Sequence, residues 1–90
     1  MPSIRVSIAN RLGLHARPAT AFAQAAGRFR ADVKVRRCDG QEWVDGKSIM
    51  QLLMLAATAG TELEIVAEGG DGAAAAEALE QLVKSRFDEE

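Results

Sequence analysis

Apolar and polar residues alternate along three short stretches of the chain, and this alternation predicts three β-strands. The stretches cover residues 4–8, 32–38 and 62–68. The dipeptide Asp39-Gly40 is typical of a two-residue hairpin turn, so residues 41–44 are expected to form a fourth strand that pairs with the second stretch.

Three further stretches repeat their apolar residues at helical spacing. The first begins near Ala16 and ends near Gly27. The second follows Ser48, whose S-x-x-Q pattern fits a capping box, and runs to Gly60. Asp71 is expected to cap the third, and the apolar side of that helix would be formed by Leu79, Leu82, Val83 and Phe87. The order of these elements predicts an α+β fold, in which three helices lie on one face of a four-stranded antiparallel sheet.

The length of 90 residues predicts a single domain that spans residues 1–90. An apolar share of 48% suits a packed core, and with aromatic residues at 4% that core must consist largely of Leu, Ile, Val and Ala. The one cysteine, Cys38, excludes an internal disulfide and favours a cytoplasmic protein. The first residues do not resemble a signal peptide. Apolar runs stay far below the ~20 residues of a membrane span, so membrane insertion is not expected.

Basic and acidic residues are divided unevenly along the chain. Residues 1–37 hold eight Lys or Arg and one acidic residue, whereas residues 38–90 hold three basic and twelve acidic residues, for a net charge of −2. The basic half predicts an electropositive face that could bind an acidic partner. The alternative is that the excess is only solvated surface charge.

The single histidine, His15, lies where a loop meets the first predicted helix. The first turn of a helix presents unpaired amides and the positive end of the helix dipole, which together bind anions. Imidazole can act as a nucleophile, and a phosphoryl group on it would face the backbone amides of Ala16 and Arg17. The Arg17 guanidinium also suits phosphate oxygens. The alternative is a plain capping residue, and a metal site is not expected because a lone histidine lacks partner ligands.

The segment Leu12–Ala19, with the sequence LGLHARPA, resembles the active-site motif of the HPr family, the histidine-containing phosphocarriers of the bacterial phosphotransferase system. The runs GKSIM at residues 46–50 and LLMLAA at residues 52–57 resemble the second conserved segment of that family. The resemblance covers nearly the whole chain. It implies an open-faced β-sandwich fold and a phosphoryl carrier that is not itself an enzyme and needs no cofactor.

The resemblance implies a role for each matching residue. His15 would be phosphorylated at Nδ1 by enzyme I, which draws on phosphoenolpyruvate, and would pass the group to enzyme II A components. Arg17 would stabilise the phosphoryl group. Ser48 matches the serine that HPr kinase/phosphorylase phosphorylates with ATP, and it can serve as a helix cap as well. A phosphate on Ser48 would add about two negative charges and repel acidic partners.

The family position of Ile49, Met50 and Leu53 implies an exposed apolar patch that docks partners, with Arg11 and Arg17 as its positive rim. A domain of 90 residues cannot enclose every side of the second helix, which is apolar more than halfway round. Methionine suits a surface that fits several partners. The alternative is that all three residues belong to the core.

Several functions are compatible with the sequence. The carrier could serve sugar uptake or the nitrogen-related branch, whose members it resembles in residues 52–55 and in the ending FDEE. A regulatory binding module that acts through phosphorylated Ser48 is disfavoured, because His15 and Arg17 are both present. An RNA-binding domain is disfavoured because the chain offers no aromatic pair on which bases could stack, so no nucleic acid is expected. We expect a monomer.

Overall fold

The computed structural model describes residues 3–88. Its elements follow the predicted order, with a short 3₁₀-helix (η1) added after the last helix. In chain order they are β1 (Ser3–Ser7), α1 (Ala16–Gly27), β2 (Asp32–Arg37), β3 (Val44–Asp45), α2 (Ile49–Met54), β4 (Glu62–Glu68), α3 (Gly72–Lys84) and η1 (Arg86–Asp88).

The four strands form one antiparallel sheet in the order β1-β4-β2-β3. The central strand β4 pairs Ile65 with Ile4 of β1 on one side and with Val35 of β2 on the other. Because side chains alternate between the two faces of a strand, this register brings the apolar positions of all three strands to the same face of the sheet. The polar positions of these strands lie on the opposite face.

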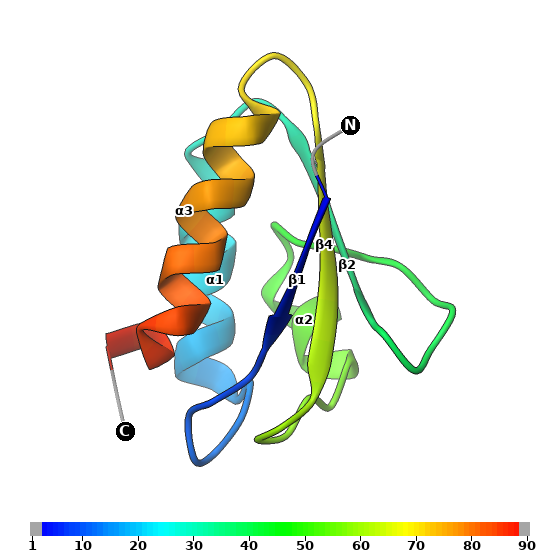
Figure 1. The fold of residues 1–90 in the computed structure, drawn as a ribbon, viewed down its shortest axis with the longest axis vertical. Helices are drawn as coiled ribbons and strands as arrows, with labels where there is room; N and C mark the ends of the chain where they lie inside the picture. Colours follow the sequence, from blue (N-terminus) through cyan, green and yellow to red (C-terminus); the bar gives the residue numbers. More distant parts are fainter. Residues whose placement is uncertain (1–2, 89–90) are drawn as a thin grey trace.

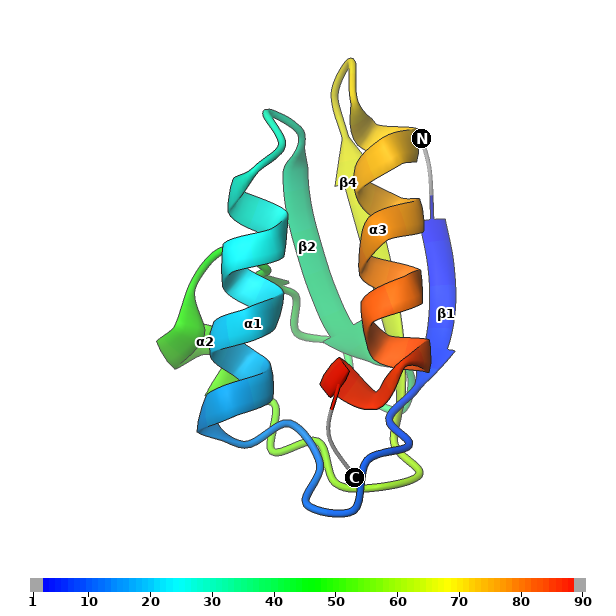
Figure 2. The ribbon, with the colours of Figure 1, turned by 90° about the vertical axis from the view of Figure 1, so that its left-hand side faces the viewer.

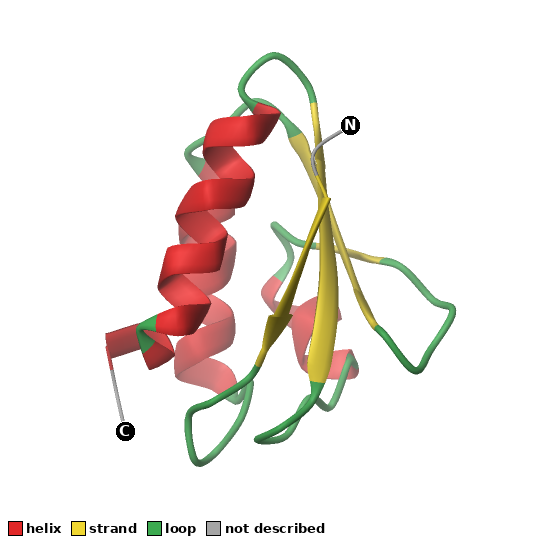
Figure 3. Cartoon of the chain, in the orientation of Figure 1, coloured by secondary structure: helices red, strands yellow, loops and turns green. Residues whose placement is uncertain are grey.

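Helices cover the apolar face of the sheet, and strands and helices form two separate layers (Figures 1 and 3). Figure 2, viewed from the helix side, shows α1 and α3 side by side in front of the strands. α2 packs against α1 and β3, and it lies beside the N-terminal half of α1. The predicted α+β fold, with an open four-stranded antiparallel sheet and three helices, is confirmed.

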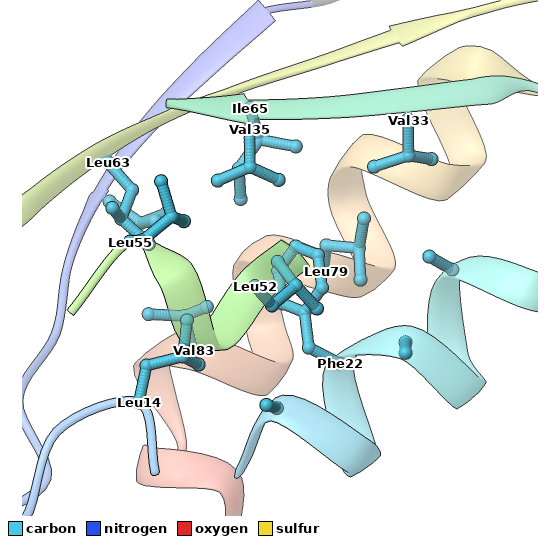
Figure 4. Packing of buried hydrophobic residues seen from close by; sticks show 14 of the residues in the cluster. Leu14, Phe22, Val33, Val35, Leu52, Leu55, Leu63, Ile65, Leu79 and Val83 are labelled. Atoms are coloured by element: carbon cyan, nitrogen blue, oxygen red, sulfur yellow. The ribbon is translucent and has the colours of Figure 1, made fainter. Parts of the chain in front are cut away.

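The core lies between the sheet and the helices. Phe22 of α1, Leu52 of α2 and Leu79 of α3 are each at most 1% exposed, and they meet beneath Val33 and Val35 of β2 (Figure 4). Burying a side chain of this size contributes roughly 1.5–3 kcal/mol relative to leaving it exposed. Aliphatic residues make up most of the core, with Phe22 and Phe87 as its buried aromatic residues, as the composition predicted.

The predicted two-residue turn at Asp39-Gly40 is wrong, whereas the predicted pairing of the following strand with β2 is confirmed. Cys38 N–H still donates to Glu62 O of β4 (2.9 Å), and Gly40 N–H donates to Arg37 O (3.0 Å), so the turn is centred one residue earlier than predicted. β3 is confined to Val44–Asp45, and a longer loop joins it to β2. Continued pairing of Cys38 with β4, a contact distant in sequence, overrides the local preference of the dipeptide.

The second helix ends at Met54, well before the predicted end at Gly60. Ala56 adopts a φ of +51°, which turns the chain out of the helix. The next residue, Ala57, accepts a hydrogen bond at its carbonyl from Leu14 N–H (2.8 Å) and so joins the loop that precedes α1. The apolar residues after Met54 therefore pack from a loop rather than from a helix.

Asp71 occupies the N-cap position of α3, as predicted, but its side chain makes no cap hydrogen bond. The carboxylate instead accepts hydrogen bonds from Arg30 N–H (2.9 Å) and Ala31 N–H (2.8 Å), in the turn after α1. The Arg30 N–H has the largest effect in holding the pKa of Asp71 below its usual value. Asp71 thus joins two connections at the same end of the molecule.

Candidate functional site at the start of the first helix

His15 takes the N-cap position of α1, with extended backbone angles (φ −84°, ψ −169°). Its carbonyl accepts a hydrogen bond from Ala19 N–H (2.9 Å) at the start of the helix. The His15 side chain makes no cap hydrogen bond to the first turn, and the residue is partly exposed. The imidazole therefore lies at the positive end of a helix of 12 residues, where a partner can reach it.

The first turn of α1 is built for an anion. Pro18 occupies a first-turn position and has no N–H, and the Ala19 amide is bonded to His15, which leaves Ala16 and Arg17 as the amides at the helix end. These are the two amides that the sequence predicts, and both residues are exposed. The first turn contains no acidic residue that would repel a phosphoryl group.

A short loop over residues 10–14 fixes the position of His15. Buried Asn10 donates from Nδ2 to Gly13 O (2.6 Å). Gly13 has a φ of +71°, and a Cβ at this position would lie 2.4 Å from Ala57 O, so only glycine fits. The buried Leu14 side chain and the hydrogen bond from its N–H to Ala57 O anchor the residue directly before His15. Sequence reasoning missed Asn10 and Ala57, because their contacts appear only in the folded chain.

Positive charge is available on both sides of His15 along the chain. Arg11 in the loop and Arg17 in α1 are both exposed, and within residues 3–88 no ion pair engages either guanidinium. A shallow hollow of about 330 Å³ follows the first turns of α1, lined by Ala16, Arg17, Thr20, Ala21 and Gln24. Helix-end amides and two exposed arginines thus lie close to His15 along the chain, and both features suit a phosphoryl group or an acidic partner.

Ser48 is the N-cap of α2, and its Oγ accepts a hydrogen bond from Gln51 N–H (3.2 Å). This half of the predicted capping box is confirmed. The other half differs, because Gln51 Oε1 accepts from Asp45 N–H (2.9 Å) rather than from Ser48. Ser48 N–H donates to Asp45 O (3.1 Å). The serine is partly exposed and belongs to a compact turn that connects β3 to α2.

The outer side of α2 is apolar and exposed. Leu52 is fully buried, whereas the outward residues are exposed by 40 to 78%, namely Ile49, Met50, Leu53 and Met54. We call these four residues the α2 surface. The predicted exposure of Ile49, Met50 and Leu53 is confirmed. Met54, at 75%, and Leu12 of the loop before His15, at 66%, are further exposed apolar residues that the prediction omitted. The position of Met54, one helical turn after Met50, could have signalled it.

The described residues contain no cluster of three or more His, Cys, Asp or Glu side chains that could hold a metal ion. Among these residues, no helix is long and apolar enough to cross a membrane.

A histidine at a helix N-terminus, with an exposed apolar helix nearby on an open-faced sheet, is the arrangement expected of a phosphocarrier. The family model described as the PTS HPr component phosphorylation site matches residues 2–85. The chain belongs to the HPr family of the phosphotransferase system.

Individual relatives agree with this assignment. Phosphocarrier protein HPr of Pseudomonas aeruginosa is 47% identical over 89 residues, which cover 99% of this chain and 98% of that protein. Phosphocarrier protein NPr of Proteus mirabilis is 38% identical over 86 residues, covering 96% and 94%. A crystal structure of HPr from Thermoanaerobacter tengcongensis matches with a TM-score of 0.93 and 38% identity, over 100% of this chain and 99% of that one.

Proposed function

We propose that His15 carries a phosphoryl group from phosphorylated enzyme I to enzyme II A components. The observation that supports this most directly is the position of His15 at the open N-terminus of α1. In the transfer, Nδ1 of the neutral imidazole attacks the phosphorus, the bond to the donor breaks as the new N–P bond forms, and the reverse sequence delivers the group to the acceptor. The carrier ends the cycle unchanged.

Ala16 and Arg17 would stabilise the group while it is carried. The amides at the helix end donate toward an anion, and they are held in place by the helix before the phosphoryl group arrives. The Arg17 guanidinium is exposed, no ion pair within residues 3–88 engages it, and it can approach the phosphoryl oxygens. Together these donors replace the water that would otherwise solvate the charge.

The α2 surface would dock the partners beside His15. The helix α2 packs against α1 and lies beside the N-terminal half of that helix, so a protein that covers the α2 surface also lies near the end of α1 that begins at His15 (Figure 2). Arg11 and Arg17 would form the positive rim of this interface and favour an acidic partner. Because exposed charges are screened by salt, the affinity should fall as ionic strength rises.

Ser48 would regulate docking through HPr kinase/phosphorylase. Its hydroxyl lies at the start of α2, directly before the α2 surface. Phosphorylation would place about two negative charges there, where the helix end tolerates them and an acidic partner is repelled. The backbone would change little, so the effect is electrostatic. Incubation with ATP and a cognate kinase should label Ser48, and the label should persist in His15→Ala.

One experiment separates the carrier from a purely regulatory module. The protein is incubated with labelled phosphoenolpyruvate and enzyme I, and the product is tested for a phosphate that is labile in acid and stable in base. The carrier requires that this label forms on wild type and on Ser48→Ala but not on His15→Ala. A protein that takes no label, while the same enzyme I phosphorylates another HPr, would instead support a module that acts through Ser48 alone.

The sugar branch is favoured over the nitrogen-related branch by the relatives. The identity to the Pseudomonas aeruginosa HPr is 47%, against 38% to the Proteus mirabilis NPr. Competition between purified enzyme I proteins of the two branches tests this, and faster labelling by the nitrogen-branch enzyme would reverse it.

We further propose a cytoplasmic monomer. Cell fractionation tests the location, and a solution mass near twice 9.6 kDa would contradict the monomer.

A further inference from the structure

Arg37 occupies a position on the inner side of the sheet that is otherwise apolar. It follows Val33 and Val35 at alternate positions of β2, so its side chain leaves the strand on the face covered by helices. Its Nη1 donates to Leu55 O (3.0 Å) and to Ala56 O (3.1 Å). A charged side chain from the sheet therefore holds the segment that follows α2.

This contact supplies what α2 lacks. A helix of six residues is too short to be stable on its own. The carbonyls at a helix C-terminus have no partner within the helix, and a cation there complements the helix dipole. Ala56 also holds a φ of +51°, a conformation that disfavours a residue with a Cβ. The Arg37 hydrogen bonds fasten the chain at this bend.

Asp39 orients the guanidinium. Arg37 Nε donates to Asp39 Oδ1 (2.9 Å) and Nη2 donates to Oδ2 (3.3 Å), so the pair is bidentate and leaves Nη1 directed at the two carbonyls. The hydrogen bond from Arg37 lowers the pKa of the Asp39 carboxyl, and the same bond raises the pKa of Arg37. Arg37 is the last residue of β2, and Asp39 lies in the turn that directly follows it.

The fastened segment leads directly to His15. Ala57, the residue after the bend, accepts the hydrogen bond from Leu14 N–H (2.8 Å), and Leu14 precedes His15. The backbone of Ala57 also lies so close to Gly13 that a Cβ there would approach its carbonyl oxygen to 2.4 Å. Movement of the segment would thus move both the end of α2 and the loop that carries the histidine.

We infer that Arg37 and Asp39 are positioning residues, which hold the α2 surface and the His15 loop in a fixed relation so that a docked partner faces the imidazole. Neither residue touches the phosphoryl group. The inference deepens the proposed phosphoryl transfer and rests on it for its functional consequence. Its structural content, the coupling of Leu55 and Ala56 to Leu14 through Arg37, stands independently of any partner.

Amide hydrogen exchange tests the coupling without a partner. Arg37→Met keeps the aliphatic stem and removes the donors, Arg37→Lys keeps the charge without the fork, and Asp39→Asn leaves the arginine unoriented. Lys34→Met is the matched control, because it removes a charge of the same sign from an exposed position on the outer face of the same strand. We expect severalfold faster exchange at the Leu14 and Ala56 amides in Arg37→Met. Arg37→Lys and Asp39→Asn should increase the exchange rates of the same amides by less.

The exchange rates are compared with that of the central Ile65 amide, which reports global opening. If the amides of Leu14, Ala56 and Ile65 accelerate equally in Arg37→Met, or if Lys34→Met produces the same local change, Arg37 contributes only general stability and the inference is overturned. Should Arg37→Met fail to fold, Asp39→Asn carries the same comparison.

Transfer kinetics test the consequence for docking. With phosphorylated enzyme I as donor, Arg37→Met and Asp39→Asn should raise KM severalfold and leave kcat nearly unchanged, and Arg37→Lys should restore part of the loss. Unchanged KM in both variants would overturn the functional part. If wild type takes no phosphoryl group from enzyme I, the proposed function fails, whereas the exchange comparison still decides whether Arg37 couples the two segments.

Discussion

The N-termini of α1 and α2 begin at residues that can carry phosphate, yet they are built differently. At α1, the His15 side chain makes no cap hydrogen bond and the helix continues for 12 residues with a mostly buried inner face. At α2, Ser48 Oγ accepts the Gln51 N–H, and the helix has only six residues, with an apolar outer side. The N-terminus of α1 leaves the Ala16 and Arg17 amides for an incoming anion. At the N-terminus of α2, the Gln51 amide already donates to the Ser48 cap.

We propose that this difference suits the two ends to separate tasks. A helix end with available amides and an exposed arginine can receive and release a charged group repeatedly without local rearrangement. A capped end attached to an exposed apolar surface is suited to contact with a partner, and a phosphate there would alter the charge of that contact. The following predictions test this division.

The largest effect is expected at His15. His15→Ala should abolish phosphoryl transfer from enzyme I, because no other residue at this end offers a nucleophilic nitrogen at the helix N-terminus. Ser48→Ala should retain transfer within a small factor. Label incorporation from phosphoenolpyruvate in single-turnover experiments distinguishes the two, and substantial labelling of His15→Ala would show that the phosphate resides elsewhere.

Arg17 should have the next largest effect. If Arg17 stabilises the phosphoryl group as we propose, Arg17→Met removes a donor to the developing charge, and a loss of about a hundredfold is expected. Arg28→Met, at the other end of α1, provides a control that removes an exposed charge of the same sign. Rapid-quench measurements of transfer to enzyme II A would report the difference, and equal losses in both variants would reduce the role of Arg17 to net charge.

Met50 should matter for docking rather than for the transfer step. Met50→Glu places a charge in the centre of the α2 surface, and loss of one central apolar contact is expected to weaken partner binding by about tenfold. Gln51→Glu makes a less suitable comparison because Gln51 caps the turn, so the control is Ala73→Glu on the exposed side of α3. Titration calorimetry with enzyme I measures both, and unchanged affinity in Met50→Glu argues against this surface.

The caps themselves should differ in stability. Ser48→Ala removes an observed hydrogen bond, and the loss of such a cap typically costs about 1 kcal/mol of unfolding free energy. His15→Ala should cost less, because the histidine side chain makes no cap bond. Urea denaturation of the two variants measures their free energies of unfolding. A larger loss in His15→Ala would mean that the His15 side chain stabilises the protein more than the Ser48 cap does.

The smallest effect concerns the opposite end of α1, which Asp71 fastens through Arg30 and Ala31. These N–H groups lower the pKa of Asp71 in the folded protein. Their contribution to the free energy of unfolding is therefore fully present above the carboxyl pKa of the unfolded chain. It is lost as pH falls through the lower pKa of the folded state, below about pH 4. Thermal unfolding from pH 7 to 2.5 should therefore depend less on pH in Asp71→Asn, and parallel curves would contradict this assignment.

Local patterns were sufficient for most of the fold. The alternation in β1 and β4 and the helical spacing in α1 and α3 predicted those elements, since each buries one side against a single core. The predictions are wrong where a contact between residues distant in sequence overrides the local preference of the chain. Cys38 stays bonded to Glu62 instead of closing a hairpin, and the chain after Met54 is drawn to Leu14 instead of continuing a helix.

The sequence by itself determined the family, the histidine and the turn that places it at a helix end, because these depend on residues that are neighbours in the chain. His15, Arg17 and Pro18 lie within one helical turn, so the sequence places them together at the helix end, and the family resemblance implies their chemistry. Only the tertiary structure decided how α2 is held beside them. The Arg37 contact with Leu55 and Ala56 joins residues far apart in sequence, and such contacts depend on the register of the sheet.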